Sequence, residues 1–253
     1  MKYMSTTKIG LVFLIGALLS FSCNGKTTTR TKQTNFQFTI NGVLVKDTNL
    51  GKDIIYFTVL RDSVAFDSAV VKVGADTVKN SGNGTYFKQA TKLFNYGQNI
   101  AISISVAKDN FVLNTSILMP GSFMITGQNH PKVTGNSASD MILYFSFSTG
   151  ASGYFVSILQ PGDVDGYTGT LAGNDLSGEG MHIPTETFYN GSNNLVFGKY
   201  KVYLVAYRNS FLAYPGMLFF LPSGLPANNI SGANGTIGAG VVEHYDSLRA
   251  DSL

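Results

Sequence analysis

The chain contains no tryptophan and one cysteine, and only 13% of its 253 residues are charged. A single cysteine excludes an intramolecular disulfide, so the stability of the fold must come from burial and hydrogen bonding. A strong basic excess, typical of nucleic-acid binders, is missing as well: 18 Lys and Arg stand against 15 Asp and Glu. Triplet and heptad repeats are also absent, which excludes collagen-like and coiled-coil fibres. We therefore predict no nucleic-acid partner.

What the chain does contain is apolar, aromatic and glycine residues. Hydrophobic residues make up 44% of the chain, with 18 Phe, 13 Tyr and 28 Gly. This content is enough for a packed core and excludes wholesale disorder. The length fits one large domain or two ordinary ones.

The amino terminus has the pattern of an export signal. Lys2 and Lys8 precede an uncharged stretch of 13 residues, Ile9 to Phe21, and the sole cysteine follows at Cys23. The stretch is shorter than the roughly 20 residues of a membrane span, but it has the length of a signal-peptide core. Residues 1–22 therefore resemble a bacterial lipoprotein signal peptide. The resemblance implies that Cys23 carries the lipid and becomes the mature amino terminus, which leaves 16 basic residues against 15 acidic ones.

The residues before the cysteine, LLSFSC, resemble the looser signal of Bacteroidota lipoproteins. Two alternatives stay open: an uncleaved helix that buries Cys23, and cleavage after Ser22 without a lipid. Residues 23–35 are polar and Thr-rich, as expected of a flexible tether. Two acyl chains hold a protein stably at a membrane. The expected location is thus the bacterial cell envelope, at the outer membrane, with the side of that membrane left open.

From Phe36 onward the hydrophobic period is two, which is typical of strands. Ile100, Ile102, Ile104 and Val106 alternate with small residues, and no helical period follows residue 23. Asn41-Gly42 stands between two apolar runs, a pattern that predicts a hairpin turn. The fold class is therefore all-β.

Turn-forming residues divide the strands into two sets. Residues 36–126 and 132–244 each approach the size of an immunoglobulin-like sandwich, with a junction at 127–131. Residues 245–253 are expected to form a polar tail.

Two segments of the second set resemble a fibronectin type III domain. Phe145–Val156 is similar to its second and third strands, and Gly198–Ala206 to its penultimate strand, with Tyr200, Val202, Leu204 and Ala206 on one face. The family's tryptophan is missing, so Phe145 or Phe147 has to fill that volume. The first set resembles immunoglobulin-like domains of Bacteroidota envelope lipoproteins through residues 67–74, 84–87 and 97–102. Together they predict two tandem antiparallel β-sandwiches, a fold that says little about function.

Catalytic motifs are absent from the sequence. The nucleophile elbow Gly-x-Ser-x-Gly and the usual zinc signatures do not occur. Three histidines (His130, His182 and His244) and three glutamates (Glu179, Glu186 and Glu243) have no motif around them and are expected at the surface or without a catalytic role. We predict a protein that is not an enzyme and has no cofactor. A pocket that joins two carboxylates, or His with Ser and Asp, would indicate an unfamiliar active site instead.

The loop around Asp163 and Asp165 is a candidate calcium site. The two carboxylates and backbone oxygens supply part of the 6–8 ligands that calcium takes, and Asn174-Asp175 would add more. The alternative is an ordinary Asp-Gly turn at Asp165-Gly166.

A recognition loop is expected after the penultimate strand, because an exposed apolar cluster usually marks an interaction site. Its residues are Arg208, Phe211, Leu212 and Tyr214, with Tyr167 and Tyr189 as possible neighbours. Phe211 and Leu212 could equally tuck under the loop or continue a strand. Five Asp-Ser/Thr-aliphatic triplets, the first at Asp62, resemble the O-glycosylation motif of Bacteroidota envelope proteins.

These observations favour a lipid-anchored envelope protein that acts as a non-enzymatic binding or structural module. Its partners would be the membrane, through the lipid on Cys23, and an envelope protein or a polysaccharide. The alternative is a glycan-binding accessory lipoprotein of a polysaccharide-uptake system. Absence of Trp argues against sugar stacking without excluding Tyr, and a planar set of exposed Tyr or Phe would favour it.

Overall fold

The computed structural model describes residues 36–129, 132–133, 141–172, 180–225 and 230–250, which belong to one compact unit, Phe36–Leu253. The expected signal peptide, the lipid attachment residue Cys23 and the tether lie outside the described residues. Within those ranges no helix is long and apolar enough to cross a membrane.

Strands make up nearly all the regular structure, and the fold is all-β as predicted. In chain order they are β1 (Phe38–Asp47), β2 (Lys52–Arg61), β3 (Val64–Ala65), β4 (Val70–Val73), β5 (Asp76–Val78), β6 (Asn80–Gly82), β7 (Thr85–Ala90), β8 (Asn99–Val106), β9 (Phe111–Leu118), β10 (Ile125–Gln128), β11 (Lys132–Val133), β12 (Met141–Phe145), β13 (Gly153–Gln160), β14 (Val164–Ala172), β15 (Met181–Ile183), β16 (Gly198–Arg208) and β17 (Asn234–Ala250). Within the described ranges, two short 3-10 helices, η1 (Ala107–Asp109) and η3 (Thr185–Phe188), interrupt them.

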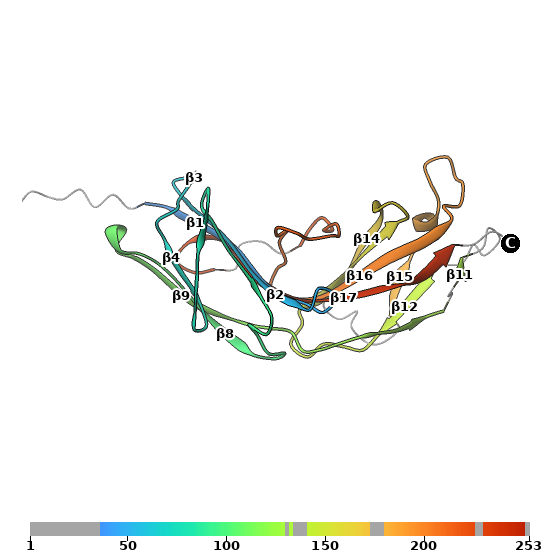
Figure 1. The fold of residues 1–253 in the computed structure, drawn as a ribbon, viewed down its shortest axis with the longest axis horizontal. Helices are drawn as coiled ribbons and strands as arrows, with labels where there is room; N and C mark the ends of the chain where they lie inside the picture. The colour runs from blue at the N-terminus through green and yellow to red at the C-terminus, as the bar shows by residue number, and fades with distance from the viewer. Residues whose placement is uncertain (1–35, 130–131, 134–140, 173–179, 226–229, 251–253) are drawn as a thin grey trace, which may run out of the picture. The chain divides into compact units, whose positions relative to one another are not determined.

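The strands of the described residues form three sheets (Figure 1). The largest has the order β14-β13-β16-β17-β1-β2-β7-β6, and we call it the shared sheet. A four-stranded sheet, β5-β4-β8-β9, packs with β1, β2 and β7 of the shared sheet, and we call these strands the first region. A three-stranded sheet, β10-β12-β15, packs with β13 and β16, and we call these strands, with β14, the second region. The result is a pair of β-sandwiches built on one continuous sheet.

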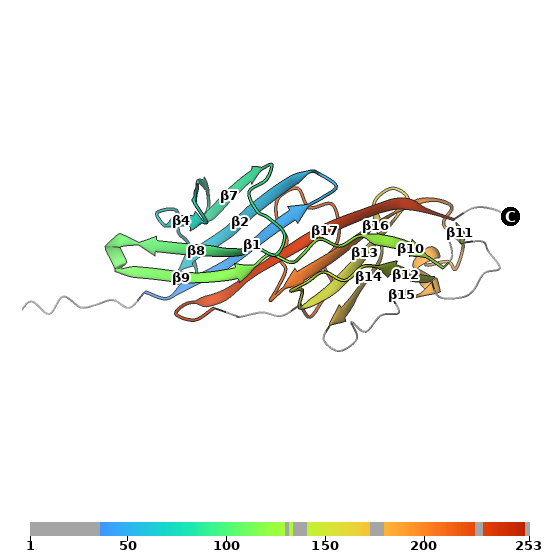
Figure 2. The same ribbon diagram turned by 90° about the horizontal axis from the view of Figure 1, so that it is seen from below.

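Strand β17 joins the two sandwiches. Its first nine residues, 234–242, pair in parallel with Thr39–Asp47 of β1, and residues 239–250 pair antiparallel with β16 (Figure 2). The carboxyl-terminal strand therefore belongs to both regions, and it extends to Ala250 where a polar tail was expected from residue 245. Strand β10 spans the expected boundary at 126 and pairs with β12 of the second region. The division into two domains stays a prediction.

The alternation predicted for the first region is confirmed in β8. Ile100, Ile102, Ile104 and Val106 are buried, whereas the residues between them are exposed or half-buried. Such a strand buries one face against the core and leaves the other facing solvent. The sheet that contains β8 therefore has a single buried face.

The predicted hairpin at Asn41-Gly42 is wrong, because β1 continues through both residues without a turn. The Asn41 side-chain oxygen accepts a hydrogen bond from the Thr236 amide, at 3.2 Å, on the neighbouring strand β17. A Cβ at position 42 would overlap the ring of Phe57. Gly42 is thus required for packing rather than for a turn.

The second region has the strands that the fibronectin type III resemblance predicts. Its second and third strands are β12 and β13, and β16 is the penultimate strand, with Tyr200, Val202, Leu204 and Ala206 buried in one cluster. Tyr154 is fully buried there, and the ring of Phe145 lies 4.8 Å from it between centroids. Phe147 is 45% exposed, so Phe145 is the phenylalanine that fills the core position.

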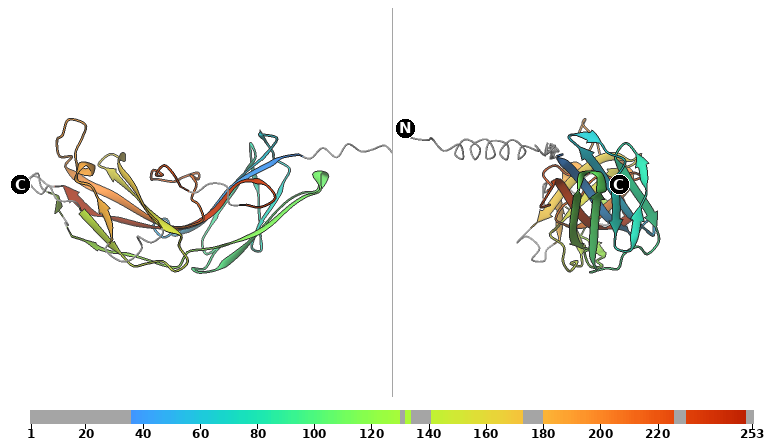
Figure 3. Two further views of the ribbon diagram at one scale, coloured as in Figure 1. Left: turned by 180° about the vertical axis from the view of Figure 1, so that it is seen from behind. Right: turned by 90° about the vertical axis from the view of Figure 1, so that its left-hand side faces the viewer.

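A second hydrophobic cluster lies on the opposite face of the shared sheet. The segment between β16 and β17 runs along this face, where Figure 3 draws it in orange to red-brown. It contributes Phe211, Tyr214 and Phe219, which pack on residues of β1, β2, β13, β16 and β17. We call this segment, residues 209–225, the cover. Because of it, central strands of the shared sheet are buried on both faces.

Candidate functional site

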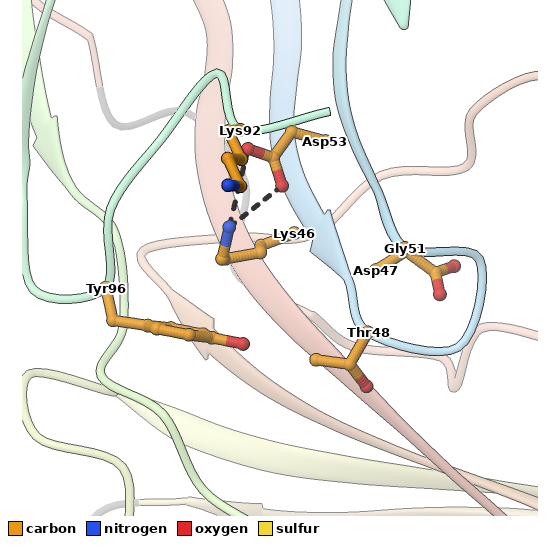
Figure 4. A pocket seen from close by; sticks show the side chains of 7 residues that line it. All are labelled: Lys46, Asp47, Thr48, Gly51, Asp53, Lys92 and Tyr96. Atoms are coloured by element: carbon orange, nitrogen blue, oxygen red, sulfur yellow. Dashed lines mark hydrogen bonds and ion pairs between the residues drawn. The ribbon is translucent and has the colours of Figure 1, made fainter. Parts of the chain in front are cut away.

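A small cavity of about 250 Å³ lies where β1 ends (Figure 4). Its lining comes from the β1–β2 hairpin and from the loop between β7 and β8: Lys46, Asp47, Thr48, Gly51, Asp53, Lys92 and Tyr96. Asp47 accepts a hydrogen bond from the Leu50 amide at 2.9 Å, and Gly51 has a positive φ of 59°. Both features fix the turn, because Asp side chains bond to nearby amides and glycine adopts the left-handed region easily.

An ion pair forms the inner wall of the cavity. The Lys46 ammonium lies 3.1 Å from a carboxylate oxygen of Asp53 and donates to the Phe94 carbonyl at 3.0 Å. The Phe94 amide donates to the other Asp53 oxygen at 2.8 Å. Asp53 is only 2% exposed, so these contacts compensate a charge that would otherwise be costly to bury. The pair holds the β7–β8 loop against the hairpin.

The groups that remain open to a ligand are on the β7–β8 loop. Tyr96 is 41% exposed, and its ring lies 5.0 Å from the Lys46 ammonium. Burial, together with Glu243 and Asp53, raises the pKa of the Tyr96 hydroxyl, which therefore stays a donor at neutral pH. The Lys92 side chain is exposed and has no partner among the described residues. The cavity thus combines an aromatic ring with an ammonium and a hydroxyl.

Two carboxylates line the cavity, the pattern that would indicate a glycosidase-like site. They do not converge, however. Lys46 is paired with Asp53 across the hairpin, and Asp47 with Lys52. Because successive residues of a strand point to opposite faces, the side chains of Asp53 and Asp47 lie on opposite faces of the sheet. The carboxylate of Asp53 is also neutralised by Lys46.

The junction between the sandwiches holds further titratable groups. Burial raises the pKa of Asp47 and of Glu243, and burial lowers the pKa of His244. The His244 ring lies 4.8 Å from that of Tyr203, and its Nε2 atom has no hydrogen-bond partner. His244, expected at the surface, is in fact half-buried. His182 and Glu186 are exposed, whereas His130 and Glu179 lie outside the described residues.

The expected recognition loop is largely buried. Phe211 and Tyr214 are 1% and 5% exposed, and Leu212 packs against the same cluster. Arg208 is half-buried and donates to the Gly150 carbonyl at 3.4 Å. Phe211, Leu212 and Tyr214 belong to the cover, so the structure has the tucked arrangement that the sequence left open as an alternative. Their burial removes the exposed apolar surface on which the recognition hypothesis depended.

The candidate calcium loop forms a turn. Asp163 has a positive φ of 62°, its amide donates to the Gln160 carbonyl, and its carboxylate lies 2.6 Å from the Lys201 ammonium. Asp165 lies in β14 opposite Leu159. Asn174 and Asp175 lie outside the described residues, and within those residues no three His, Cys, Asp or Glu side chains gather as a metal site would require.

Sequence reasoning missed the residues of the cavity. The segment from Lys46 to Asp53, KDTNLGKD, repeats Lys-Asp on both sides of a turn, and this symmetry could have placed Lys46 opposite Asp53. For Lys92 and Tyr96 no comparable signal exists, because a long-range fold contact brings their loop to the hairpin.

Comparisons with known proteins add little to this geometry. No protein-family model matches the chain, and no curated protein matches it. Among solved structures, fibronectin(III)-like modules of Clostridium thermocellum CbhA match 85% of this chain and 95% of their own, at 10% identity and a TM-score of 0.25. A likeness this weak carries no argument, so the fold rests on the strand order described above.

Proposed function

We propose that the protein is a non-enzymatic binding module of the bacterial cell envelope, anchored by a lipid on Cys23. The sequence pattern at residues 1–23 supports the anchor, and residues 24–35 supply a polar tether to the first strand. The outer membrane is the proposed location. The ligand or partner would meet the sandwich pair at the membrane surface.

The observation that carries the binding role is the open side of the cavity at the end of β1. Tyr96 offers an exposed ring and a protonated hydroxyl, and Lys92 offers an unpaired ammonium. The charged pair Lys46–Asp53 is fully engaged in holding the walls together. Such a site can bind a small polar group by stacking and hydrogen bonding, while its carboxylates do not converge for acid–base chemistry.

The anchor is tested by replacing its cysteine. Cys23→Ser removes the sulfur that would carry the lipid, so the protein should leave the membrane fraction and appear in the soluble fraction. Ser22→Ala, which keeps the cysteine, is the matched control and should stay with the membrane. A Cys23→Ser variant that fractionates with membranes as the wild type does would overturn the anchor.

A glycan is the ligand class that the cavity favours. Sugar rings stack on exposed aromatic faces, and Tyr96 is the aromatic residue that lines the cavity. Among the described residues, no two of the exposed rings Tyr96, Tyr144, Phe147, Phe197 and Phe220 are in ring contact, so Tyr96 is the ring on which the glycan proposal rests.

A glycan array probed with the wild type and with Tyr96→Ala tests this second proposal. Tyr144→Ala is the matched control, since Tyr144 is 40% exposed and lies on β12, away from the cavity. Binding that is lost in Tyr96→Ala and kept in Tyr144→Ala would support a glycan site. An array without any bound sugar would leave an envelope protein as the partner and remove the glycan proposal.

A further inference from the structure

The edge strands of the three sheets differ in how they are protected. Natural sheets blunt their edges with short strands, bulges, prolines or charges, because an unpaired edge can add a strand from another chain. Edge strands β5, β6 and β15 have three residues each, and β10 has four with a register shift. The nine-residue edge β14 has a register shift, contains Asp165 and includes two glycines. Each of these edges carries at least one protective feature.

Strand β9 carries none of these protections. It is eight residues long, Phe111–Leu118, and its sequence FVLNTSIL has no charge, proline or glycine. Its pairing with β8 runs from end to end without a register shift. It forms the border of the four-stranded sheet (Figure 2). Among the edges of the described sheets, β9 is therefore the one suited to strand addition.

The hydrogen-bond pattern shows which groups of β9 are unpaired. The Gly74 amide donates to the Ala101 carbonyl, so Ala101 bonds toward β4. Residues of a central antiparallel strand bond alternately to its two neighbours, which means that the even-numbered residues of β8 bond to β9. They pair with odd-numbered residues of β9, such as Ile100 with Ile117. The hydrogen bond from the Met119 amide to the Gln98 carbonyl continues this pattern, since it also joins an odd-numbered residue after β9 to an even-numbered residue before β8.

The even-numbered residues of β9 consequently direct their backbone groups away from the sheet. These residues are Val112, Asn114, Ser116 and Leu118. Val112 is 61% exposed, Asn114 and Ser116 are exposed, and Leu118 is half-buried. No backbone partner for their outward amides and carbonyls exists among the described residues. The edge thus offers four amides and four carbonyls in regular spacing.

We propose that β9 pairs with β9 of a second copy of this chain, antiparallel about a two-fold axis at Thr115. In this register Val112 faces Leu118 of the second copy, and Asn114 faces Ser116. An apolar residue then meets an apolar residue, and an amide meets a hydroxyl, both favourable cross-strand pairs. The strand contains no charge that would be repelled by its own copy. This self-complementarity favours a second copy over an unrelated peptide, and two-fold pairing is the commonest oligomer symmetry.

Sedimentation of the detergent-extracted full-length protein tests the association. The wild type should sediment as a dimer that dissociates on dilution. Val112→Lys places a charge on the edge, the device by which natural sheets prevent pairing, and should weaken the dimer at least about tenfold, or ~1.4 kcal/mol. Val64→Lys is the matched control, since Val64 is 68% exposed and lies on β3. A wild type that is monomeric at every concentration, or a dimer unaffected by Val112→Lys, would overturn the proposal.

Disulfide cross-linking tests the register and the identity of the partner. At the axis the two Thr115 residues form a non-hydrogen-bonded pair, with Cα atoms about 4.5 Å apart, which a disulfide can span. Thr115→Cys should therefore give a cross-linked dimer under oxidation. Val64→Cys should not, and the wild type controls for Cys23. Absence of a Thr115→Cys dimer would overturn this register, and a cross-link to a protein of another mass would replace the second copy by a different partner.

Discussion

The two faces of the shared sheet in the second region are buried by different means. One face of β13 and β16, with Tyr154, Tyr200 and Leu204, packs against the three-stranded sheet. The other face, with Phe155 and Tyr203, packs against the cover, which is a segment without regular strands. Large rings pack on both faces: Phe145 contacts Tyr154 on the first face, and Phe211 contacts Phe155 on the second. The comparison shows that a loop can do the work of a third layer.

The consequence is visible in the burial of single strands. Strand β8, with one covered face, alternates between buried and exposed residues. Seven consecutive residues of β13, Gly153–Leu159, are buried. Strands buried on both faces read as continuous apolar runs. The cover thus changes the sequence pattern that the central strands can carry.

Loss of an aromatic residue under the cover should have the largest effect on stability. Phe155 is fully buried, and its ring lies 5.3 Å from that of Phe211 and 6.0 Å from that of Phe219. Phe155→Ala should lower the free energy of unfolding by about 3–5 kcal/mol, measured by urea unfolding, because it leaves a cavity beneath the cover. Phe147→Ala, at a ring that is 45% exposed, is the control and should cost far less. Equal costs for the two variants would mean that the cover adds no tightly packed second face.

The seam between β17 and the cover depends on a glycine. A Cβ at Gly238 would overlap the Ser210 carbonyl oxygen at the start of the cover. Gly238→Ala should therefore destabilise the protein by roughly 1–3 kcal/mol in the same measurement, since the backbone has to shift. Gly191→Ala is the matched control, because a Cβ there meets nothing within 4 Å. If Gly238→Ala were as stable as wild type, the cover would have to move freely away from β17.

The sequence predicted strands with one buried face better than it predicted the cover that buries the second face of the shared sheet. Alternation in β8 predicted a strand with one buried face, and Tyr200 to Ala206 predicted the inner face of β16 correctly. For the segment after β16 the sequence left an exposed recognition loop and a tucked segment both open, since nothing in Phe211 or Tyr214 shows which surface they meet. Likewise, the dipeptide Asn41-Gly42 has turn chemistry, but its partners Thr236 and Phe57 come from other strands. Local patterns predict strands, whereas long-range contacts decide the cavity, the cover and the shared strand.

Two adjacent titratable residues of β17, Glu243 and His244, should make the stability of the fold depend on pH. Glu243 and His244 point to opposite faces of the shared sheet. Burial raises the pKa of Glu243, so the folded state disfavours its ionised form and loses stability as the pH rises above about 4.3 toward the raised value. Glu243→Gln should therefore be as stable as wild type near pH 4 and more stable than wild type toward pH 8. Thermal unfolding of both proteins across this pH range measures the difference. Glu186→Gln, at an exposed glutamate, should show no such trend.

His244 should act in the opposite direction. Burial is the main reason that its pKa is lowered; Lys201 lowers it further, and Asp246 and Asp47 oppose the shift. Its protonation in the unfolded chain below about pH 6.5 therefore costs folding stability in acid. His244→Gln should reduce the loss of stability between pH 7 and pH 5. If His244→Gln lost as much stability between pH 7 and pH 5 as wild type does, the His244 ring would have to be reached by water on the cover side of the sheet.

The smallest effect is expected at the ion pair that links the β13–β14 turn to β16. Lys201 and Asp163 are 46% and 62% exposed, and exposed pairs contribute about 0–1 kcal/mol. Asp163→Asn keeps a side chain that tolerates the left-handed backbone at this position, so its unfolding free energy should stay within about 1 kcal/mol of wild type. Calcium should not stabilise either form if the lysine is the partner of this carboxylate. A rise in melting temperature with added calcium that is lost in Asp163→Asn would instead assign the loop to the metal, with Lys201 displaced.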